Sequence, residues 1–141
     1  EKNDMVTINI MDNINVLSLK EKLGIDHNKT YNPPTVEHIS KLLNSTEKLL
    51  SFLIGFIDGD GSIQYQKDKI TFKSLRIHIH SFWFNIMKWI SNELNKIGIN
   101  SSCIICNRGY TQLNICSITN YQIFKNFINN NNLPILERKW K

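Results

Sequence analysis

The sequence is poor in cysteine, glycine and proline, and this scarcity excludes several classes of protein. Six glycines and three prolines among 141 residues, with 21% charged residues, argue against a collagenous, low-complexity or disordered chain. Three cysteines cannot all pair with one another, and Cys103-x-x-Cys106 has no second ligand pair of the kind that a zinc ribbon needs. We therefore expect a globular protein of a reducing compartment without structural zinc.

Long apolar runs are also missing. No run approaches the roughly 20 apolar residues that span a bilayer, and residues 1–4 lack the basic start of a signal peptide. Membrane insertion and classical secretion are therefore not expected, and we expect no membrane among the partners. The apolar share of 41% suffices for one hydrophobic core but hardly for two.

Charge is divided unevenly along the chain, which indicates an anionic partner for one half. Residues 1–60 carry six Lys and Arg against nine Asp and Glu, whereas residues 61–141 carry eleven against three. Lys and Arg neutralise phosphates and release counterions, so a basic segment of this kind favours nucleic acid binding. If the charge is considered by itself, an alternative explanation is that these lysines only keep the protein soluble.

Hydrophobic periodicity predicts an N-terminal extension over residues 1–44 and an α+β domain over residues 45–141. The extension is expected to contain a short strand over 5–11 and short helices over 16–23 and 36–43, the second capped by Thr35. The domain is expected to contain helices over 47–57, 82–97 and 120–128 and strands over 62–69, 70–80, 102–106 and 111–117. Their order is αββαββα.

The most informative segment is Leu53-Ile54-Gly55-Phe56-Ile57-Asp58-Gly59-Asp60-Gly61, in which an apolar helix ends in two carboxylates. A helix C-terminus already carries partial negative charge, so acidic residues there favour a bound cation. The glycines free the backbone, and a hard ion such as Mg²⁺ prefers oxygen ligands. One such helix offers too few carboxylates, so the missing ligands would come from a second copy and from substrate phosphate.

This segment resembles the signature of the LAGLIDADG homing endonucleases. Leu53, Gly55, Ile57, Asp58, Asp60 and Gly61 match the signature, and Ile54, Phe56 and Gly59 are common variants of its looser positions. The resemblance covers residues 45–141, because the ββαββα order that follows is also that of the family. It implies that a four-stranded antiparallel sheet forms half of a saddle over the DNA major groove.

The resemblance also implies roles for individual residues. Asp60 would be the metal-binding carboxylate at the scissile phosphate, with the backbone carbonyl of Gly59 as an auxiliary ligand. Asp58 would be structural, as a hydrogen-bonding residue at the helix end. Lys139, in Ile135-Leu136-Glu137-Arg138-Lys139, matches the basic residue that the family places near the cleavage centre.

A second motif helix would pack beside the first in this family. Leu53, Gly55 and Ile57 are the residues expected to make that contact, with the small Gly55 permitting a close approach. The family often has Gln after the second strand and Arg or Lys further on, and this chain has Ser81 and Asn85 at the corresponding positions.

Alternation along the strands predicts a DNA-reading face. Leu75, Ile77 and Ile79 are expected to face the core, which turns the residues between them outward. Gln, Asn and Arg make paired hydrogen bonds to base edges, whereas Lys near phosphates positions without specifying. The predicted face consists of Gln64, Gln66, Ser74, Arg76, His78, His80, Arg108, Gln112 and Asn114, with Lys67, Lys69 and Lys73 nearer the phosphates.

The resemblance implies a site-specific, Mg²⁺-dependent DNA endonuclease that makes double-strand breaks at a long site. One motif corresponds to half of such an enzyme, which requires a homodimer or a second motif-bearing half in the same or another chain. The alternatives are a group I intron maturase, with intron RNA as its partner, and a cleavage-inactive binding or structural protein of the same fold. Abundant Ile, Asn and Lys, whose codons are AT-rich, favour a mitochondrial location together with the resemblance.

Overall fold

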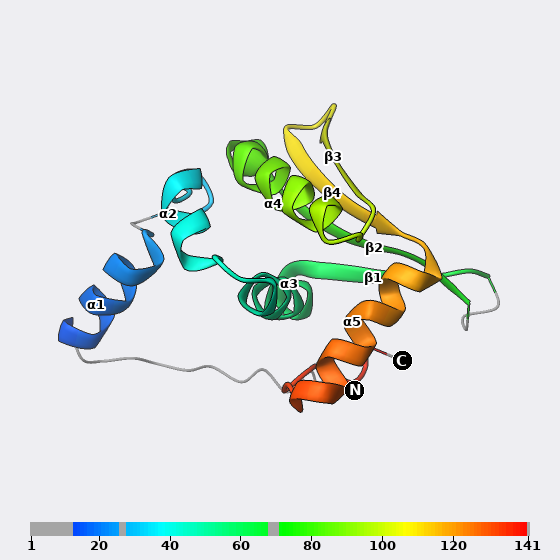
Figure 1. The fold of residues 1–141 in the computed structure, drawn as a ribbon. Coiled ribbons are helices and arrows are strands. Elements are labelled where there is room, and N and C mark those ends of the chain that lie inside the picture. Colours follow the sequence, from blue (N-terminus) through cyan, green and yellow to red (C-terminus); the bar gives the residue numbers. More distant parts are fainter. Residues whose placement is uncertain (1–12, 26–27, 68–70, 141) are drawn as a thin grey trace, which may run out of the picture.

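The computed structural model describes the backbone of residues 13–25, 28–67 and 71–140 (Figure 1). In chain order the described elements are α1 (Asn13–Leu23), α2 (Val36–Leu42), α3 (Thr46–Asp60), β1 (Gly61–Tyr65), β2 (Phe72–His80), the 3-10 helix η1 (Ser81–Trp83), α4 (Phe84–Lys96), β3 (Ser101–Cys106), β4 (Tyr110–Cys116) and α5 (Ile118–Asn131). The predicted αββαββα order is confirmed from α3 onward, and the strand predicted over 5–11 lies outside the described residues. Among those residues, no helix combines the length and apolarity needed to cross a bilayer.

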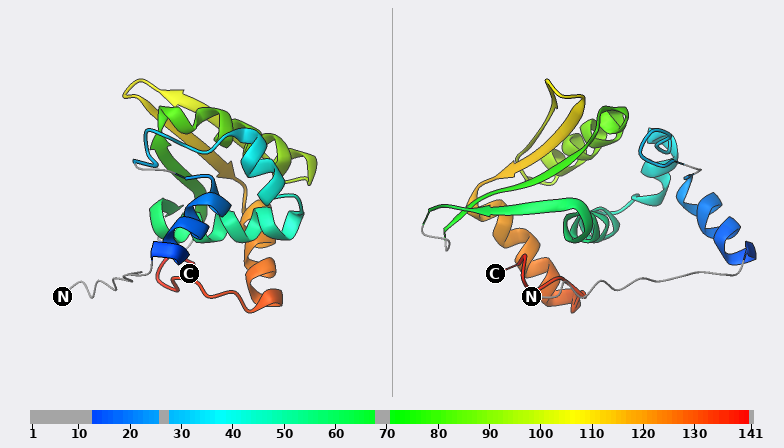
Figure 2. Two further views of the ribbon diagram at one scale, coloured as in Figure 1. Left: turned by 90° about the vertical axis from the view of Figure 1, so that its left-hand side faces the viewer. Right: turned by 180° about the vertical axis from the view of Figure 1, so that it is seen from behind.

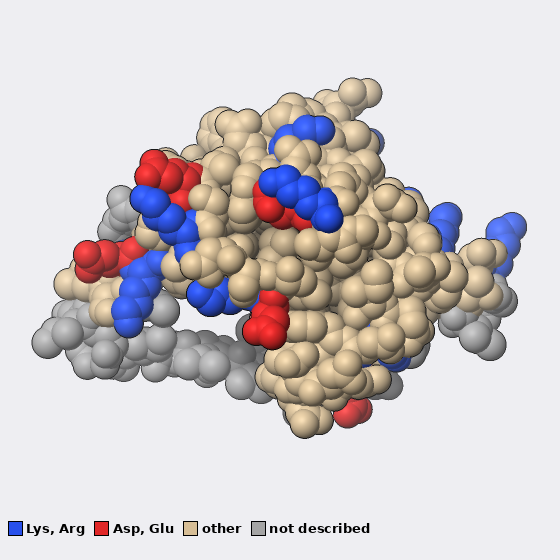
Figure 3. Space-filling view, in the orientation of Figure 1, with Lys and Arg blue, Asp and Glu red and all other residues tan. Residues whose placement is uncertain are grey.

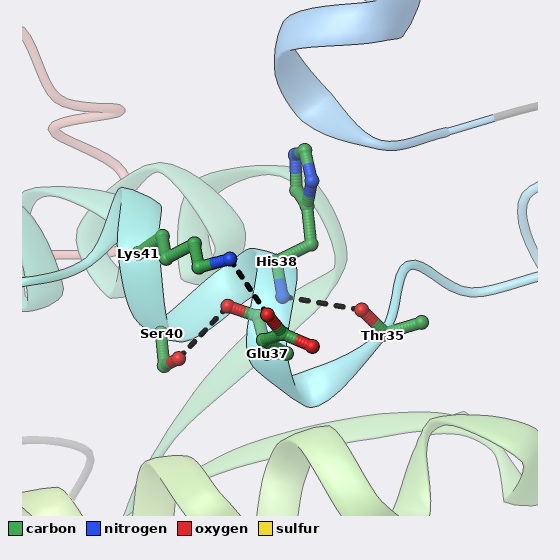
Figure 4. A network of polar contacts seen from close by, with 5 residues as sticks. All are labelled: Thr35, Glu37, His38, Ser40 and Lys41. Atoms are coloured by element: carbon green, nitrogen blue, oxygen red, sulfur yellow. Dashed lines mark hydrogen bonds and ion pairs between the residues drawn. The ribbon is translucent and has the colours of Figure 1, made fainter.

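The second helix of the N-terminal extension is formed by local signals and joins the main core. The Thr35 hydroxyl accepts a hydrogen bond from the backbone amide of His38 at 3.1 Å, which confirms the predicted cap (Figure 4). Lys41 and Glu37 pair at 2.6 Å on its exposed side. On the opposite side Ile39 is buried in the same hydrophobic cluster as α3 and α4. The α2 helix of the extension therefore packs on the domain.

The four strands form one antiparallel sheet in the order β1-β2-β4-β3. Its core face carries Leu75, Ile77, Leu113 and Ile115, all fully buried. The helices α3, α4 and α5 contact this sheet and run along the same side of it in the right-hand view of Figure 2. One face of the sheet is thereby committed to the core, which leaves the polar face as the surface for a ligand.

A β-bulge interrupts the regular alternation that the sequence predicts for β2. Gln64 pairs with Ser74 but Tyr65 pairs with Phe72, so Lys73 is the extra residue. The bulge turns Phe72 toward α5, where its ring stacks on Tyr121 with 4.5 Å between centroids. Lys73 is left exposed beside the turn between β1 and β2.

Gly61 is the residue at which α3 changes directly into β1. Its amide donates to the carbonyls of Ile57 and Phe56 and so ends the helix. A Cβ atom at this position would lie 2.6 Å from the Cα atom of Ile57, a backbone atom that cannot move aside. Only glycine allows the strand to begin so close to the helix.

The substitution Gly61→Ala is expected to lower the free energy of unfolding by about 1–3 kcal/mol, the usual cost of overpacking. Urea unfolding measures this change. Gly59→Ala is the matched control, because a Cβ there meets nothing within 4 Å and alanine favours a helix. Equal stability of the two variants would contradict the close approach.

Candidate functional site

The site lies at the C-terminal end of α3. The Ser45 hydroxyl caps the other end by accepting from the amide of Lys48 at 3.3 Å, so the helix has defined limits. Asp58 is half-buried near the end, whereas Gly59 and Asp60 are exposed. Two carboxylates of one motif therefore have different surroundings.

Asp58 holds the C-terminal segment of the chain against the helix. Its Oδ2 accepts from the backbone amide of Leu136 at 3.0 Å, and its Oδ1 accepts from the indole Nε1 of Trp140 at 2.6 Å. Both oxygens are thus used within the protein. The predicted structural role of Asp58 as a hydrogen-bonding residue is confirmed.

Lys139 caps the same helix end from outside. Its ammonium donates to the carbonyls of Ile57 and Asp58 at 2.7 Å each and to that of Gly61 at 2.9 Å. A cation at a helix C-terminus neutralises the partial negative charge of the last carbonyls. Lys139 therefore lies at the motif, as predicted, but all three of its N–H groups bond to the backbone. These contacts make it a positioning residue, and a catalytic role for it stays a prediction.

Aromatic side chains anchor the segment that carries Lys139. Trp140 is buried and stacks on Tyr121, with 6.0 Å between centroids and 5° between the ring planes. Tyr65 donates from its hydroxyl to the carbonyl of Lys139 at 3.1 Å and also hydrogen-bonds the hydroxyl of Tyr121 at 3.2 Å. Burial is the main cause that raises the pKa of Tyr121, and the hydrogen bond to Tyr65 raises it further. Sequence reasoning missed Tyr65 and Trp140, because no short-range pattern joins them to the motif.

Asp60 and Gly59 supply the oxygen atoms that remain free to bind a ligand. The carboxylate of Asp60 makes no hydrogen bond or ion pair to another described residue. Lys139 donates to the carbonyls of Ile57, Asp58 and Gly61 but not to the carbonyl of Gly59. Such oxygen donors fit a hard cation such as Mg²⁺. Within the described residues there is no group of three or more His, Cys, Asp and Glu that could hold a metal ion.

The exposed face of α3 differs from the predicted pairing face. Leu53 and Ile57 are 0% exposed, so they are core residues and the prediction that they contact a second helix is wrong. Gly55 is exposed, with nothing within 4 Å of a Cβ placed there. Ser51, Gly55 and Gly59 are each four residues apart, which aligns three small exposed residues along one face. The motif alone does not show which of its apolar residues are buried in the core.

The polar face of the sheet brings together residues that the alternation predicted. Arg76 lies opposite Asn114 and His78 opposite Gln112 on the neighbouring strand. His78 Nε2 and the Gln112 side-chain oxygen are 2.8 Å apart. Arg76 Nε and Asn114 Oδ1 are buried atoms without a hydrogen-bond partner in the described structure.

Ser74 departs from the predicted face. Its side chain is buried, with 1% exposure, and its hydroxyl donates to the Gln64 side-chain oxygen at 3.4 Å, so it is not exposed to DNA. Gln64 covers it from the neighbouring strand.

The remaining predicted contacts lie at the ends of the strands. Gln66, Lys67, Lys73 and Arg108 are exposed, whereas Lys69 lies outside the described residues. Among the described residues, only basic side chains are coloured at the right-hand edge of Figure 3, beside the turn between β1 and β2. Over α1 and α2, on the left, basic and acidic side chains are mixed. The charge asymmetry of the sequence is thus visible on the surface.

Cys103 is a poor candidate for a reactive or metal-binding thiol. Cys103, Cys106 and Cys116 are free thiols. Burial raises the pKa of Cys103 to about 11, against a smaller opposing effect of the Lys88 charge. A thiol with that pKa stays protonated at neutral pH and is a poor nucleophile and metal ligand.

Comparisons with known proteins were made on the sequence and on the fold. A family model described as a LAGLIDADG-like domain matches residues 47–129. The homing endonuclease I-CvuI, solved in complex with the I-CreI target and Mg, is 22% identical over 58% of this chain and 55% of that chain, with a TM-score of 0.46. The LAGLIDADG meganuclease I-AabMI, solved bound to uncleaved DNA, is 21% identical over 62% of this chain and 30% of that chain, with a TM-score of 0.44.

This chain therefore spans about half the length of the first solved chain and under a third of the second. The comparison with curated proteins gave no match.

Lys139→Met is expected to lower the free energy of unfolding by about 2 kcal/mol, since it leaves three carbonyls without their charged donor. Chemical denaturation measures the loss. Lys41→Met removes an exposed ion pair and should change stability by less than about 0.5 kcal/mol. If both variants unfold at the same denaturant concentration, Lys139 does not support the helix end.

Proposed function

Because the chain belongs to the LAGLIDADG-like domain family, whose model matches residues 47–129, we propose that it is one motif-bearing half of a site-specific DNA endonuclease. The αββαββα fold of residues 46–131 is that of the LAGLIDADG homing endonucleases. The observation that carries the proposal is Asp60, an exposed carboxylate at the end of α3 with no partner among the described residues. Its neighbour Asp58 is used for structure, so the two motif carboxylates have separate tasks.

The uncovered small-residue face of α3 supports pairing of two such halves. Ser51, Gly55 and Gly59 would let a second helix approach closely, since the distance between helix axes depends on the side chains at the contact. A twofold pair is self-complementary and brings both helix ends, and so both Asp60 carboxylates, to one axis. The site that one chain leaves incomplete would be completed in this way.

Divalent cations held there would polarise the scissile phosphate and lower the pKa of an attacking water. In the proposed enzyme Asp60 and the Gly59 carbonyl bind the cation, and Lys139 keeps the carbonyls around them in place. The polar face with Arg76, Asn114 and Gln112 reads base edges in the major groove. Double-stranded DNA is the substrate, and the organellar composition of the sequence makes mitochondrial DNA the first to test.

Asp60→Asn is expected to retain DNA binding and to reduce Mg²⁺-dependent cleavage about a thousandfold, the equivalent of the several kcal/mol that a metal contributes. The assay incubates the protein with an AT-rich organellar DNA library in Mg²⁺ or Ca²⁺ and sequences the new ends. Glu47→Gln, at the opposite end of α3, is the matched control and should cleave as the wild type does.

Two outcomes of that assay would contradict the proposal. Breaks that persist in Asp60→Asn would exclude Asp60 as the metal ligand. Tight binding of DNA or intron RNA without breaks would favour a maturase or a cleavage-inactive binder of the same fold. The contacts of Lys139 support that alternative, because they leave its ammonium no free N–H for a phosphate.

Gly55→Leu tests the pairing face separately from cleavage. The wild type should sediment as a dimer, and the variant's dimer dissociation constant should rise about tenfold or more, a loss above about 1.4 kcal/mol. Its fold should not change, because nothing lies within 4 Å of the added Cβ. Asn92→Leu, on an exposed position of α4, is the control. A wild-type monomer would overturn the homodimer and favour a second half in another chain.

A further inference from the structure

Four aromatic rings gather at the end of the polar face, and we call Tyr31, His80, Phe82 and Tyr110 the aromatic patch. Tyr31, Phe82 and Tyr110 are 58%, 57% and 50% exposed, although large aromatic side chains usually stabilise a protein by burial. The Tyr31 ring meets His80 edge-on at 4.9 Å between centroids, and His80 meets Phe82 at 4.7 Å. Tyr110 lies opposite His80 on the adjacent strand.

Hydrogen bonds hold the segments that carry these rings. Trp83 donates from its indole to the carbonyl of Lys29 at 3.1 Å, which fastens the N-terminal segment beside η1. Tyr31 donates its amide to the carbonyl of Asn28 at 2.8 Å. The amide of Ser81 donates to the carbonyl of Gly109 at 2.9 Å, which joins η1 to the turn before Tyr110. The rings are therefore held in place before any ligand binds.

The segments that carry the aromatic patch have positive charge and are continuous with the predicted DNA-reading face. The segments 28–32, 80–84 and 104–112 contain Lys29 and Arg108 and no Asp or Glu. His80 belongs to the same strand face as Arg76 and His78. Next to the patch is a hollow lined by His78, Cys106, Asn107, Arg108 and Tyr110. Exposed aromatic rings beside positive charges suit a partner that has both planar rings for stacking and phosphate groups.

We propose that the aromatic patch binds unpaired nucleotides of a single nucleic acid strand. Unpaired bases stack on aromatic side chains while basic residues follow the backbone, whereas a duplex buries its base faces within its own stack. Tyr31 lies outside residues 47–129, so this binding site requires the N-terminal extension in addition to the family domain. The proposal is independent of cleavage and of Asp60.

The test measures fluorescence anisotropy with labelled strands of about 20 nucleotides, oligo-dT and oligo-rU, and with a blunt hairpin duplex. Tyr31→Leu and Phe82→Leu keep apolar side chains but remove the flat rings. Each should weaken binding of the single strands about tenfold or more and leave duplex binding unchanged. The two strands show whether DNA or RNA is preferred. Ile118→Ala, at an apolar residue of α5 that is 58% exposed, is the control and should bind as the wild type does.

Unchanged single-strand binding in both ring variants would overturn the proposal, as would an equal loss for strand and duplex. Altered self-association of Tyr31→Leu or Phe82→Leu in sedimentation would instead assign the patch to a protein contact. Circular dichroism checks that the variants fold, which is expected because both rings are more than half exposed. Asp60→Asn should bind the single strands normally, so a failure of the nuclease proposal is distinguishable from a failure of this one.

Discussion

The closure of the C-terminal end of α3 is the interaction on which the site depends. A helix end leaves carbonyls without partners, and here a strand must start within one residue of that end. Gly61 supplies one amide donor next to the helix end, and Lys139 supplies a charged donor from 78 positions away. Asp58 fastens the segment that brings Lys139 there. The helix end is therefore rigid at the point where Asp60 leaves it.

This closure separates two carboxylates that are close in sequence. Asp58 lies between the helix and the C-terminal segment, where both of its oxygens accept hydrogen bonds. Asp60, two residues later, is exposed and makes no hydrogen bond or ion pair to another described residue. A fixed backbone with one satisfied and one unsatisfied carboxylate is a suitable base for a metal ligand, because binding then requires little reorganisation of the protein. The small residues on the exposed side of α3 leave space for the second half that we propose.

Local features could be predicted from the sequence, and long-range contacts could not. The cap at Thr35 and the strand alternation around Ile77 depend on neighbouring residues, and both are present. The helix predicted over 47–57 continues to Asp60. The bulge at Lys73 depends on the packing of Phe72 against α5, which no alternation reveals. Leu53 and Ile57 were assigned to a pairing face although only the fold shows that they are core. In the site, the motif identified Asp60, but the partners of Lys139 required the tertiary structure.

The distance in sequence between Asp58 and Trp140 has a consequence for synthesis. Domains form from the N-terminus as the ribosome releases the chain, so α3 and the sheet emerge well before residues 136–140. Until residues 136–140 emerge, Asp58 lacks both of its hydrogen-bond donors and the carbonyls of the helix end lack their ammonium. The C-terminal end of α3 in a nascent chain is thus unfinished while the sheet can already fold.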